Sequence, residues 1–325
     1  MSDSLPYLLQ LTVRLAEGCG RRPADWRAAM ADAVRSFQEP DHGFRGRDAG
    51  SDLYYTAFAV RTLAILDELD PLTATSTLGY LRRRLTSHES LIDLVSLIFA
   101  AYTLEAATGD DVFSDADTEW NARLRQELER FRCDDGGYAR TPLGKAGSVY
   151  QTFLNLLCYE LLDEPVPDPE SIVAFVRRQA AEGGGFLEIR VAKRAGTNPT
   201  AAAIGILELL GELDRGTVAQ TAEFLRQLQT DEGGIRANLR TPIPDLLSTF
   251  TGMWTLDRLG AARELDLPRL RRYVETLECA KGYRGAEIDP ASDVEYTFYG
   301  VGAMALLDVV EDRSLTDEDH GRDGG

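Results

Sequence analysis

Ten basic residues follow glycine-containing turns, and the chemistry that they offer is anion binding. Guanidinium and ammonium groups bind phosphate oxygens, and free N–H groups at helix N-termini add to such a site. Because acidic residues outnumber basic ones by 53 to 35, ten cations in one class of loop stand out. Two interpretations stay open for these cations: solvated loop charge and a diphosphate site. The ten are Arg45, Arg47, Arg140, Lys145, Arg190, Lys193, Arg194, Arg236, Arg240 and Arg284.

An Asp, a Ser or, once, a Gly recurs four positions before a threonine. Asp and Ser are preferred helix N-caps, so the simplest interpretation is that they start helices. The alternative is that the carboxylates of this set, which lie close to the loop cations in the sequence, do electrostatic work in a reaction. The pairs are Asp52–Thr56, Ser148–Thr152, Gly196–Thr200, Asp245–Thr249 and Asp293–Thr297, and Asp93 takes the same place in a further unit.

Aromatic residues accompany these positions in the more apolar stretches. Such stripes often pack a core, but they can also line a cavity for a long apolar ligand or stabilise a carbocation through their ring faces. The residues that we single out for a cavity wall are Tyr54, Tyr150, Trp254, Tyr296 and Tyr299.

The elements that position these residues form a repeat. Glycine followed by an aromatic or aliphatic residue recurs at Gly43, Gly137, Gly185, Gly234 and Gly282, with spacings of 94, 48, 49 and 48 residues. Since 94 is about twice 48, one turn between Gly43 and Gly137 has degenerated. The sequence therefore contains six repeats of about 48 residues.

Each repeat contains two predicted helices, one amphipathic and one apolar on nearly all sides. Six such pairs predict an all-α fold, an (α/α)6 toroid with outer and inner rings, over residues 1–310. The tail, 311–325, is acidic and should be disordered. The outer stretches are Trp26–Phe37, Thr73–Leu85, Thr118–Phe131, Ser171–Gln179, Thr217–Leu228 and Pro268–Leu277, and the inner ones are Asp52–Leu69, Ile92–Leu104, Ser148–Leu162, Pro199–Leu210, Asp245–Leu256 and Asp293–Leu307.

The composition excludes several classes of protein. A formal net charge of −18 argues against nucleic-acid binding and against an anionic-membrane clamp. The four cysteines contain no CxxC pair, which favours a reducing cytoplasm over a disulfide framework. The N-terminal segment carries Arg14 and Glu17 within its apolar stretch, unlike a secretory signal, and no run reaches membrane-spanning length.

With its Gly-Gly-aromatic turns, the chain resembles the prenyltransferase and squalene-cyclase repeat superfamily from about Trp26 to Val310. In protein prenyltransferase β-subunits the barrel mouth holds a zinc ion, bound by an Asp, a Cys two residues later and a His in the last repeat. Here the Asp falls on Asp245, but the Cys position is Leu247 and the His position is Tyr296. The resemblance therefore implies an isoprenoid ligand and a helical partner subunit, without the usual zinc.

The class II terpene cyclases of this superfamily start one inner helix with Asp-x-Asp-Asp-Thr, whose middle Asp protonates an alkene or epoxide. Asp293-Val-Glu-Tyr-Thr297 resembles that motif, with Glu295 in place of the acid. Asp293 and Glu295 could share a proton, although residues two apart on a helix diverge by about 200°. The alternative is a structural or solvated carboxylate.

We therefore expect an isoprenoid-handling cyclase or transferase. Two other hypotheses stay open: a non-catalytic toroid that binds an isoprenoid or a partner protein, and a glycan-processing (α/α)6 enzyme with two carboxylates across a cleft. In the first hypothesis Glu295, Asp293 and Asp245 supply acid or electrostatic work, and the diphosphate is held by Arg45, Arg140, Lys145, Arg236, Arg240 and Arg284.

Overall fold

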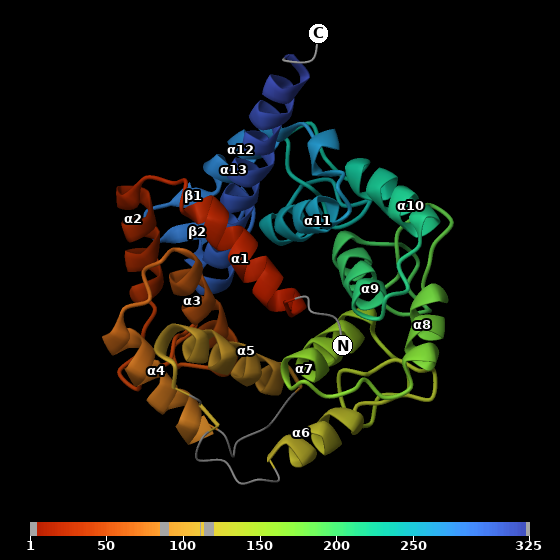
Figure 1. The fold of residues 1–325 in the computed structure, drawn as a ribbon, viewed down its shortest axis with the longest axis horizontal. Coiled ribbons are helices and arrows are strands. Elements are labelled where there is room, and N and C mark those ends of the chain that lie inside the picture. Colours follow the sequence, from red (N-terminus) through yellow and green to blue (C-terminus); the bar gives the residue numbers. More distant parts are fainter. Residues whose placement is uncertain (1–4, 85–90, 111, 114–119, 323–325) are drawn as a thin grey trace.

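A computed structural model describes residues 5–84, 91–110, 112–113 and 120–322. Its helices form two concentric rings, which confirms the all-α toroid (Figure 1). The outer ring consists of α2 (Ala24–Arg35), α4 (Pro71–Arg84), α6 (Trp120–Glu129), α8 (Pro169–Arg177), α10 (Arg215–Arg226) and α12 (Leu267–Thr276). The inner ring consists of α3 (Leu53–Ile65), α5 (Leu91–Thr108), α7 (Val149–Leu161), α9 (Thr197–Leu209), α11 (Leu246–Arg258) and α13 (Val294–Arg322).

The ring closes where the last inner helix, α13, packs against the first, α3 (Figure 1). The inner helices are buried on most sides, as their apolar sequences predict. In α9, for example, Thr197 and Ile206 are both buried, although residues nine positions apart lie on opposite sides of a helix. A short 3-10 helix, Ala262–Glu264, connects α11 to α12.

Each described turn folds as a small antiparallel ladder that leads into an inner helix. In the last repeat the ladder is a three-stranded sheet of β1 (Glu278–Cys279), β2 (Gly282–Arg284) and β3 (Ser292–Asp293), in that order. Tyr283 pairs with Glu278 on one side and with Asp293 on the other. The turn of the second repeat falls on residues 85–90, outside the described residues.

The recurring threonine ties each turn to its inner helix. The N–H of Tyr138 donates to Oγ1 of Thr152 at 2.9 Å, and that hydroxyl donates to the carbonyl of Ser148 at 2.8 Å. The threonine therefore satisfies a buried backbone N–H that the turn leaves without a partner. The same bond from a turn N–H joins Phe44 to Thr56, Phe186 to Thr200, Ile235 to Thr249 and Tyr283 to Thr297.

The glycine pair of the third repeat shows why the turns require glycine. Gly136 has φ of +90°, a conformation that L side chains rarely adopt. A Cβ on Gly137 would lie 2.7 Å from the ring of Phe175 on α8. The pair therefore lets the turn reverse and lets the next outer helix pack directly against it.

One helix, α1 (Tyr7–Cys19), belongs to neither ring and is absent from the sequence prediction. It lies across the end of the toroid where the inner helices finish (Figure 1). Arg14 binds Asp257 near the end of α11, and the backbone of Gly18 lies against Ala305 of α13. The helix thus covers this end of the ring.

Helix α13 continues to Arg322, through most of the segment for which the sequence predicts disorder. Neither glycine nor proline occurs between Gly302 and Gly321, so the sequence contains nothing to stop the helix there. Among the described helices, none combines the length and the apolar character that a membrane span requires.

Candidate active site

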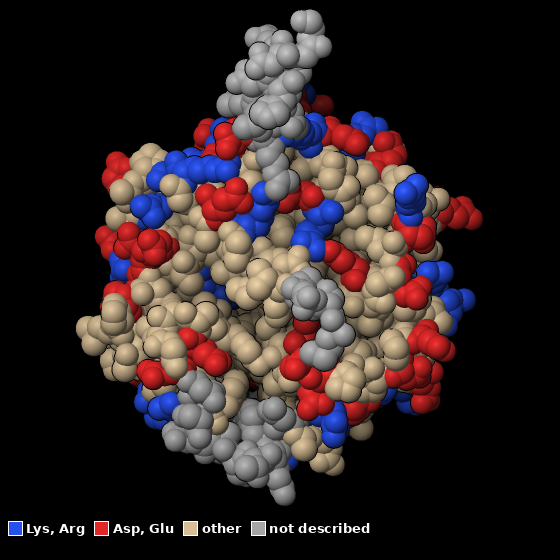
Figure 2. Space-filling model, in the orientation of Figure 1, with Lys and Arg blue, Asp and Glu red and all other residues tan. Residues whose placement is uncertain are grey.

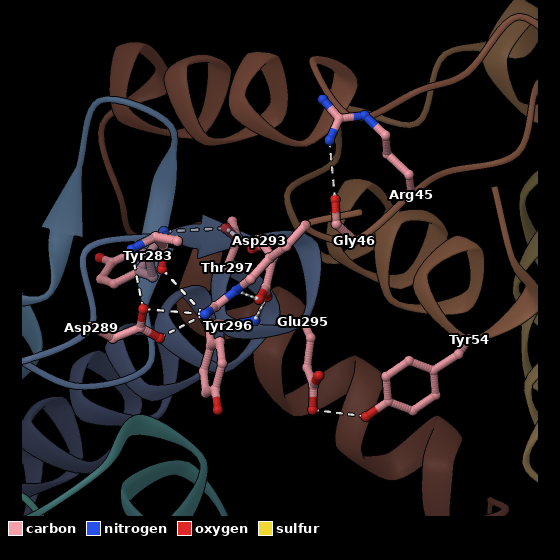
Figure 3. Close-up of polar contacts among 11 residues, drawn as sticks. Arg45, Gly46, Tyr54, Tyr283, Asp289, Asp293, Glu295, Tyr296 and Thr297 are labelled. Atoms are coloured by element: carbon pink, nitrogen blue, oxygen red, sulfur yellow. Dashed lines mark hydrogen bonds and ion pairs between the residues drawn. The ribbon is translucent and has the colours of Figure 1, made fainter. Parts of the chain in front are cut away.

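The side chain of Glu295, in the first turn of α13, reaches from the last inner helix to the first. The hydroxyl of Tyr54 on α3 donates a hydrogen bond of 2.7 Å to its Oε1 (Figure 3). The hydroxyl of Tyr299, one turn further along α13, donates to the same oxygen at 3.3 Å. Both described donors to the carboxyl group therefore bind Oε1, and Oε2 receives neither of them.

The surroundings of Glu295 favour its protonated form. Desolvation raises the pKa of this half-buried carboxyl group, and the nearby charge of Asp293 raises it further. The hydrogen bonds from Tyr54 and Tyr299, and the charge of Arg47, act in the opposite direction. A carboxyl group whose pKa is raised by burial, and whose conjugate base has two hydrogen-bond donors in place, is suited to proton transfer.

Aromatic rings surround this acid from three inner helices. Phe58 lies 5.0 Å from Tyr54 and 5.3 Å from Phe298. Phe250 of α11 lies 5.4 Å from Tyr299. All of these distances join ring centroids, and the rings present faces and edges with little polar surface.

Asp293 and Glu295 do not form a pair. Asp293 is buried and caps α13, since its Oδ1 accepts the N–H of Tyr296 at 2.8 Å. Its Oδ2 binds Nε of Arg47 at 2.8 Å, and the same guanidinium binds Asp289 at 2.6 Å. Figure 3 shows Asp293 and Asp289 together, while Glu295 points toward Tyr54.

Asp245 is likewise an N-cap. Its Oδ1 accepts the N–H of Ser248 at 2.7 Å, and its Oδ2 accepts the Ser248 hydroxyl at 2.8 Å. Desolvation raises the pKa of this carboxyl group. Both carboxyl oxygens are therefore engaged in starting α11.

The loop cations do not gather at one point. Arg45 binds Glu39 at 3.0 Å and covers the ring of Phe37, apart from the Glu295 group (Figure 3). Arg284 donates to the carbonyl of Thr276, at the end of an outer helix. Arg236 is half-buried, and three more are exposed, namely Arg140, Lys145 and Arg240.

The other predicted wall residues take different roles. Tyr150 is 39% exposed, yet desolvation raises its pKa to about 12, which fits a ring that borders an internal space. Tyr296 lies under Arg47, whose guanidinium carbon is 5.6 Å from the ring centroid. Trp254 is buried, and its indole N–H donates to the hydroxyl of Tyr7 at 2.8 Å, so this residue holds α1 in place.

Two charged residues next to the aromatic rings of the centre are missing from the predicted set. Arg61, on α3, has its guanidinium carbon 4.4 Å from the centroid of Phe298. Glu188, in the fourth turn, accepts bonds from the Ser148 hydroxyl and from the Tyr150 N–H, and desolvation raises its pKa. The sequence does mark Arg61, because it is a charged residue within the otherwise apolar stretch of α3.

The family model of the prenyltransferase alpha-alpha toroid domain matches residues 7–96 and 85–322. The chain belongs to this family. The protein farnesyltransferase subunit beta of Pisum sativum is 28% identical to this chain over 186 residues. That match covers 54% of this chain and 43% of the pea subunit, so it spans less than half of the relative.

Solved structures share the toroid fold. Protein geranylgeranyltransferase-I of Candida albicans, complexed with GGPP, superposes with a TM-score of 0.64 at 14% identity, over 78% of this chain and 83% of that one. A type II terpene cyclase from Scytonema, in complex with geranylgeranyl dihydroxybenzoate, gives 0.62 at 12% identity, over 93% and 99%. An alpha-1,6-mannanase of Salegentibacter gives 0.60 at 14% identity, over 88% and 99%. At these identities the likeness concerns the fold alone.

In this toroid the three positions of the family's zinc ligands hold Asp245, Leu247 and Tyr296. The carboxylate of Asp245 is occupied by Ser248, Leu247 offers only hydrocarbon, and desolvation raises the pKa of the Tyr296 phenol. Among the residues that the structure describes, no group of three or more His, Cys, Asp or Glu side chains is placed to hold a metal ion.

Proposed function

We propose that this toroid is an isoprenoid cyclase that starts its reaction by protonating an alkene with Glu295. The observation that carries the proposal is the half-buried Glu295 carboxyl group, whose pKa is raised by desolvation and whose Oε1 is held by Tyr54 at 2.7 Å. Membership of the prenyltransferase toroid family supports an isoprenoid substrate. The cyclase from Scytonema, which shares the fold, supports cyclisation.

The geometry suits a proton transfer from Oε2. Both phenol donors bind Oε1, so that the acidic proton resides on the other oxygen. As the proton leaves for an alkene carbon, negative charge spreads to Oε1 and the bond from Tyr54 becomes charge-assisted. That bond therefore stabilises the transition state more than the ground state.

The remaining steps balance without any further reagent. The alkene π electrons form the new C–H bond and leave a tertiary carbocation, which a second alkene of the same chain attacks to form a ring. The rings of Phe58 and Phe250, which lie next to Tyr54 and Tyr299, stabilise the cation by their quadrupoles. A final loss of one proton to solvent makes the reaction an isomerisation, and solvent returns a proton to Glu295.

We further propose that the reaction does not use the zinc site of the protein prenyltransferases. Asp245, Leu247 and Tyr296 do not fit a zinc ion, because a structural or catalytic zinc takes nitrogen, sulfur or free carboxylate ligands. The only carboxylate of the three has both oxygens in hydrogen bonds with Ser248.

The test is product analysis with polyprenoid substrates. The purified protein is incubated with farnesyl diphosphate, geranylgeranyl diphosphate or squalene, and the extract is examined by mass spectrometry for isomers of the substrate. Glu295→Gln should lower the rate at which the isomer forms by about 10²–10⁴-fold. Glu129→Gln is the matched control, since Glu129 on α6 also accepts two tyrosine hydroxyls on Oε1, at 2.5 and 2.7 Å, outside the centre.

Intact ligand without turnover would instead support a binding toroid. In that case the substrate would be recovered unchanged with both the wild-type protein and the Glu295→Gln variant. A helical partner subunit, such as the resemblance to β-subunits implies, would then be sought on the outer helices.

A further inference from the structure

A cavity of about 650 Å³ lies beneath α1, at the end of the toroid where the inner helices finish. Its wall is mostly apolar, with Leu8 and Leu9 from α1, Ala64 from α3, Phe99 from α5 and Leu161 from α7. Figure 2 views this end and shows the surface hollowed beside α1. The volume lies in the range of small-molecule sites.

Arg61 brings a positive charge into this wall. The centroids of Phe298 and Phe58 lie 4.4 and 5.9 Å from its guanidinium carbon. Arg61 makes no hydrogen bond or ion pair with any residue that the structure describes. Desolvation lowers its pKa to about 10, so the side chain remains a cation at neutral pH.

An unpaired guanidinium away from bulk water is costly, and proteins usually pair such a charge. Two other arginines that lie over aromatic rings are paired in this way: Arg47 binds two carboxylates and Arg258 binds Glu208. The missing counter-charge at Arg61 therefore calls for an anion from outside the described chain.

The acidic residues of the cavity do not supply that counter-charge. Asp67 and Glu105 also line it, but both are exposed, and neither forms an ion pair with Arg61. Bulk solvent screens such exposed charges over about 8 Å at physiological ionic strength. The cavity thus combines an apolar wall, an acidic rim in contact with solvent and one cation farther inside.

We propose that this cavity binds a single-chain amphiphile, with its carboxylate or phosphate head group on Arg61 and its hydrocarbon chain against the apolar wall beneath α1. The head-group position lies farther along α3 than the Glu295 centre, although both border the rings of Phe58 and Phe298. Tyr54 and Arg61 are seven residues apart on α3, which is about 10 Å along a helix, and the ring of Phe58 lies between them. The proposal does not depend on the cyclase reaction.

Calorimetry with four probes tests the head group and the chain separately. We expect the wild-type protein to bind dodecanoate and dodecyl phosphate, to bind dodecanol at least tenfold more weakly, and not to bind inorganic phosphate measurably. A preference for dodecyl phosphate over dodecanoate, or the reverse, identifies the head group. Equal affinity for dodecanol and for both anions would overturn the proposal.

Arg61→Met should reduce the affinity for the anionic probes to that for dodecanol, while Arg61→Lys should retain most of it. The control is Arg226→Met, because Arg226 is an exposed arginine of α10 that is paired with Glu223. Unchanged binding by a folded Arg61→Met protein would contradict the assignment.

Hydrogen exchange of the wild-type protein locates the ligand without any substitution. Dodecanoate should slow exchange in α1 and in the second half of α5. Protection of the turn at 281–293 instead would place the anion at the opposite end and overturn the proposal. Glu295→Gln should bind dodecanoate normally, so that failure of the cyclase reaction and failure of this site give different results.

Discussion

The Tyr54 hydroxyl donates a 2.7 Å hydrogen bond to Oε1 of Glu295, and in doing so joins the first inner helix of the toroid to the last. The same contact closes the ring and holds the candidate acid. Because Tyr54 and Glu295 are 241 residues apart, only the closed fold can bring them together. Ring closure therefore positions the carboxyl group that we propose as the acid.

Removal of that bond should change both the strength of the acid and its pH dependence. The Tyr54 bond lowers the Glu295 pKa, so Tyr54→Phe should raise it and move the loss of activity with rising pH to higher pH. At low pH the turnover should fall about tenfold, because the conjugate base loses a charge-assisted bond. A pH–rate profile measures both effects.

The control for this variant is Tyr283→Phe, which removes the hydrogen bond of 2.9 Å to Glu278 outside the centre. Its pH–rate profile should match that of the wild-type protein. An unchanged profile in Tyr54→Phe would show that Glu295 does not titrate during the reaction.

The buried acid should make stability depend on pH in a defined direction. Desolvation raises the Glu295 pKa above its ordinary value of 4.5, so the folded state binds the proton more tightly than the unfolded state. Ionisation of Glu295 therefore lowers the free energy of unfolding, and this loss grows as the pH rises above 4.5. Glu295→Gln should therefore unfold at higher urea than the wild-type protein at pH 8, with the difference vanishing near pH 4.

Asp289 should show the opposite trend. Its hydrogen bond from Arg47 lowers its pKa below 3.8, so its contribution to stability is present at neutral pH and is lost as the pH falls through the folded pKa. Asp289→Asn should be less stable than the wild-type protein at pH 7, and the gap should narrow on acidification. If the difference in unfolding free energy between variant and wild-type protein changed with pH in the same direction for both variants, these assignments would be contradicted.

The repeat threonines should matter more than other buried threonines of the same helices. Thr249→Val leaves the buried N–H of Ile235 without its acceptor, which should cost about 1–3 kcal/mol of unfolding free energy. Thr255→Val, one turn and a half further along α11, removes only a bond to the carbonyl of Thr251 and should cost less. Urea unfolding of both variants provides the comparison. Equal losses of unfolding free energy would show that the repeat threonine is no more important than Thr255.

The packing of α1 against α13 can be tested at a single glycine. A Cβ on Gly18 would lie 2.1 Å from the carbonyl oxygen of Ala305, so Gly18→Ala should push α1 away from α13 and destabilise the protein by about 1–3 kcal/mol. At Gly20 the nearest atom to a Cβ is 3.4 Å away. Gly20→Ala should leave stability and exchange of α1 unchanged, whereas Gly18→Ala should expose α1 to rapid exchange.

Much of the fold could be predicted from the sequence because the repeat spacing and the helical periods are local signals. The six helix pairs follow from them, and the threonine bonds explain why the spacing is kept. Helix α1 was missed because it stands outside the repeat, although Leu11 and Leu15 are buried one turn apart.

The candidate site was only partly predictable. Glu295 and its tyrosines could be named because a motif and an inner-helix position marked them. The loop arginines could not be placed, since spacing shows that Arg45 and Arg284 follow turns but not that they point to Glu39 and Thr276. Helix geometry alone indicates that Asp293 and Glu295 point in different directions. It does not show that Asp293 binds Arg47 and that Glu295 binds Tyr54, because these contacts form only when the ring closes.

The most direct test of the central claim is turnover in D2O. Protonation by Glu295 should give a cyclic isomer that carries one deuterium from solvent at the former alkene carbon, and Glu295→Gln should lower its rate by about 10²–10⁴-fold. A cyclic product without deuterium, or one formed at the wild-type rate by Glu295→Gln, would contradict the account.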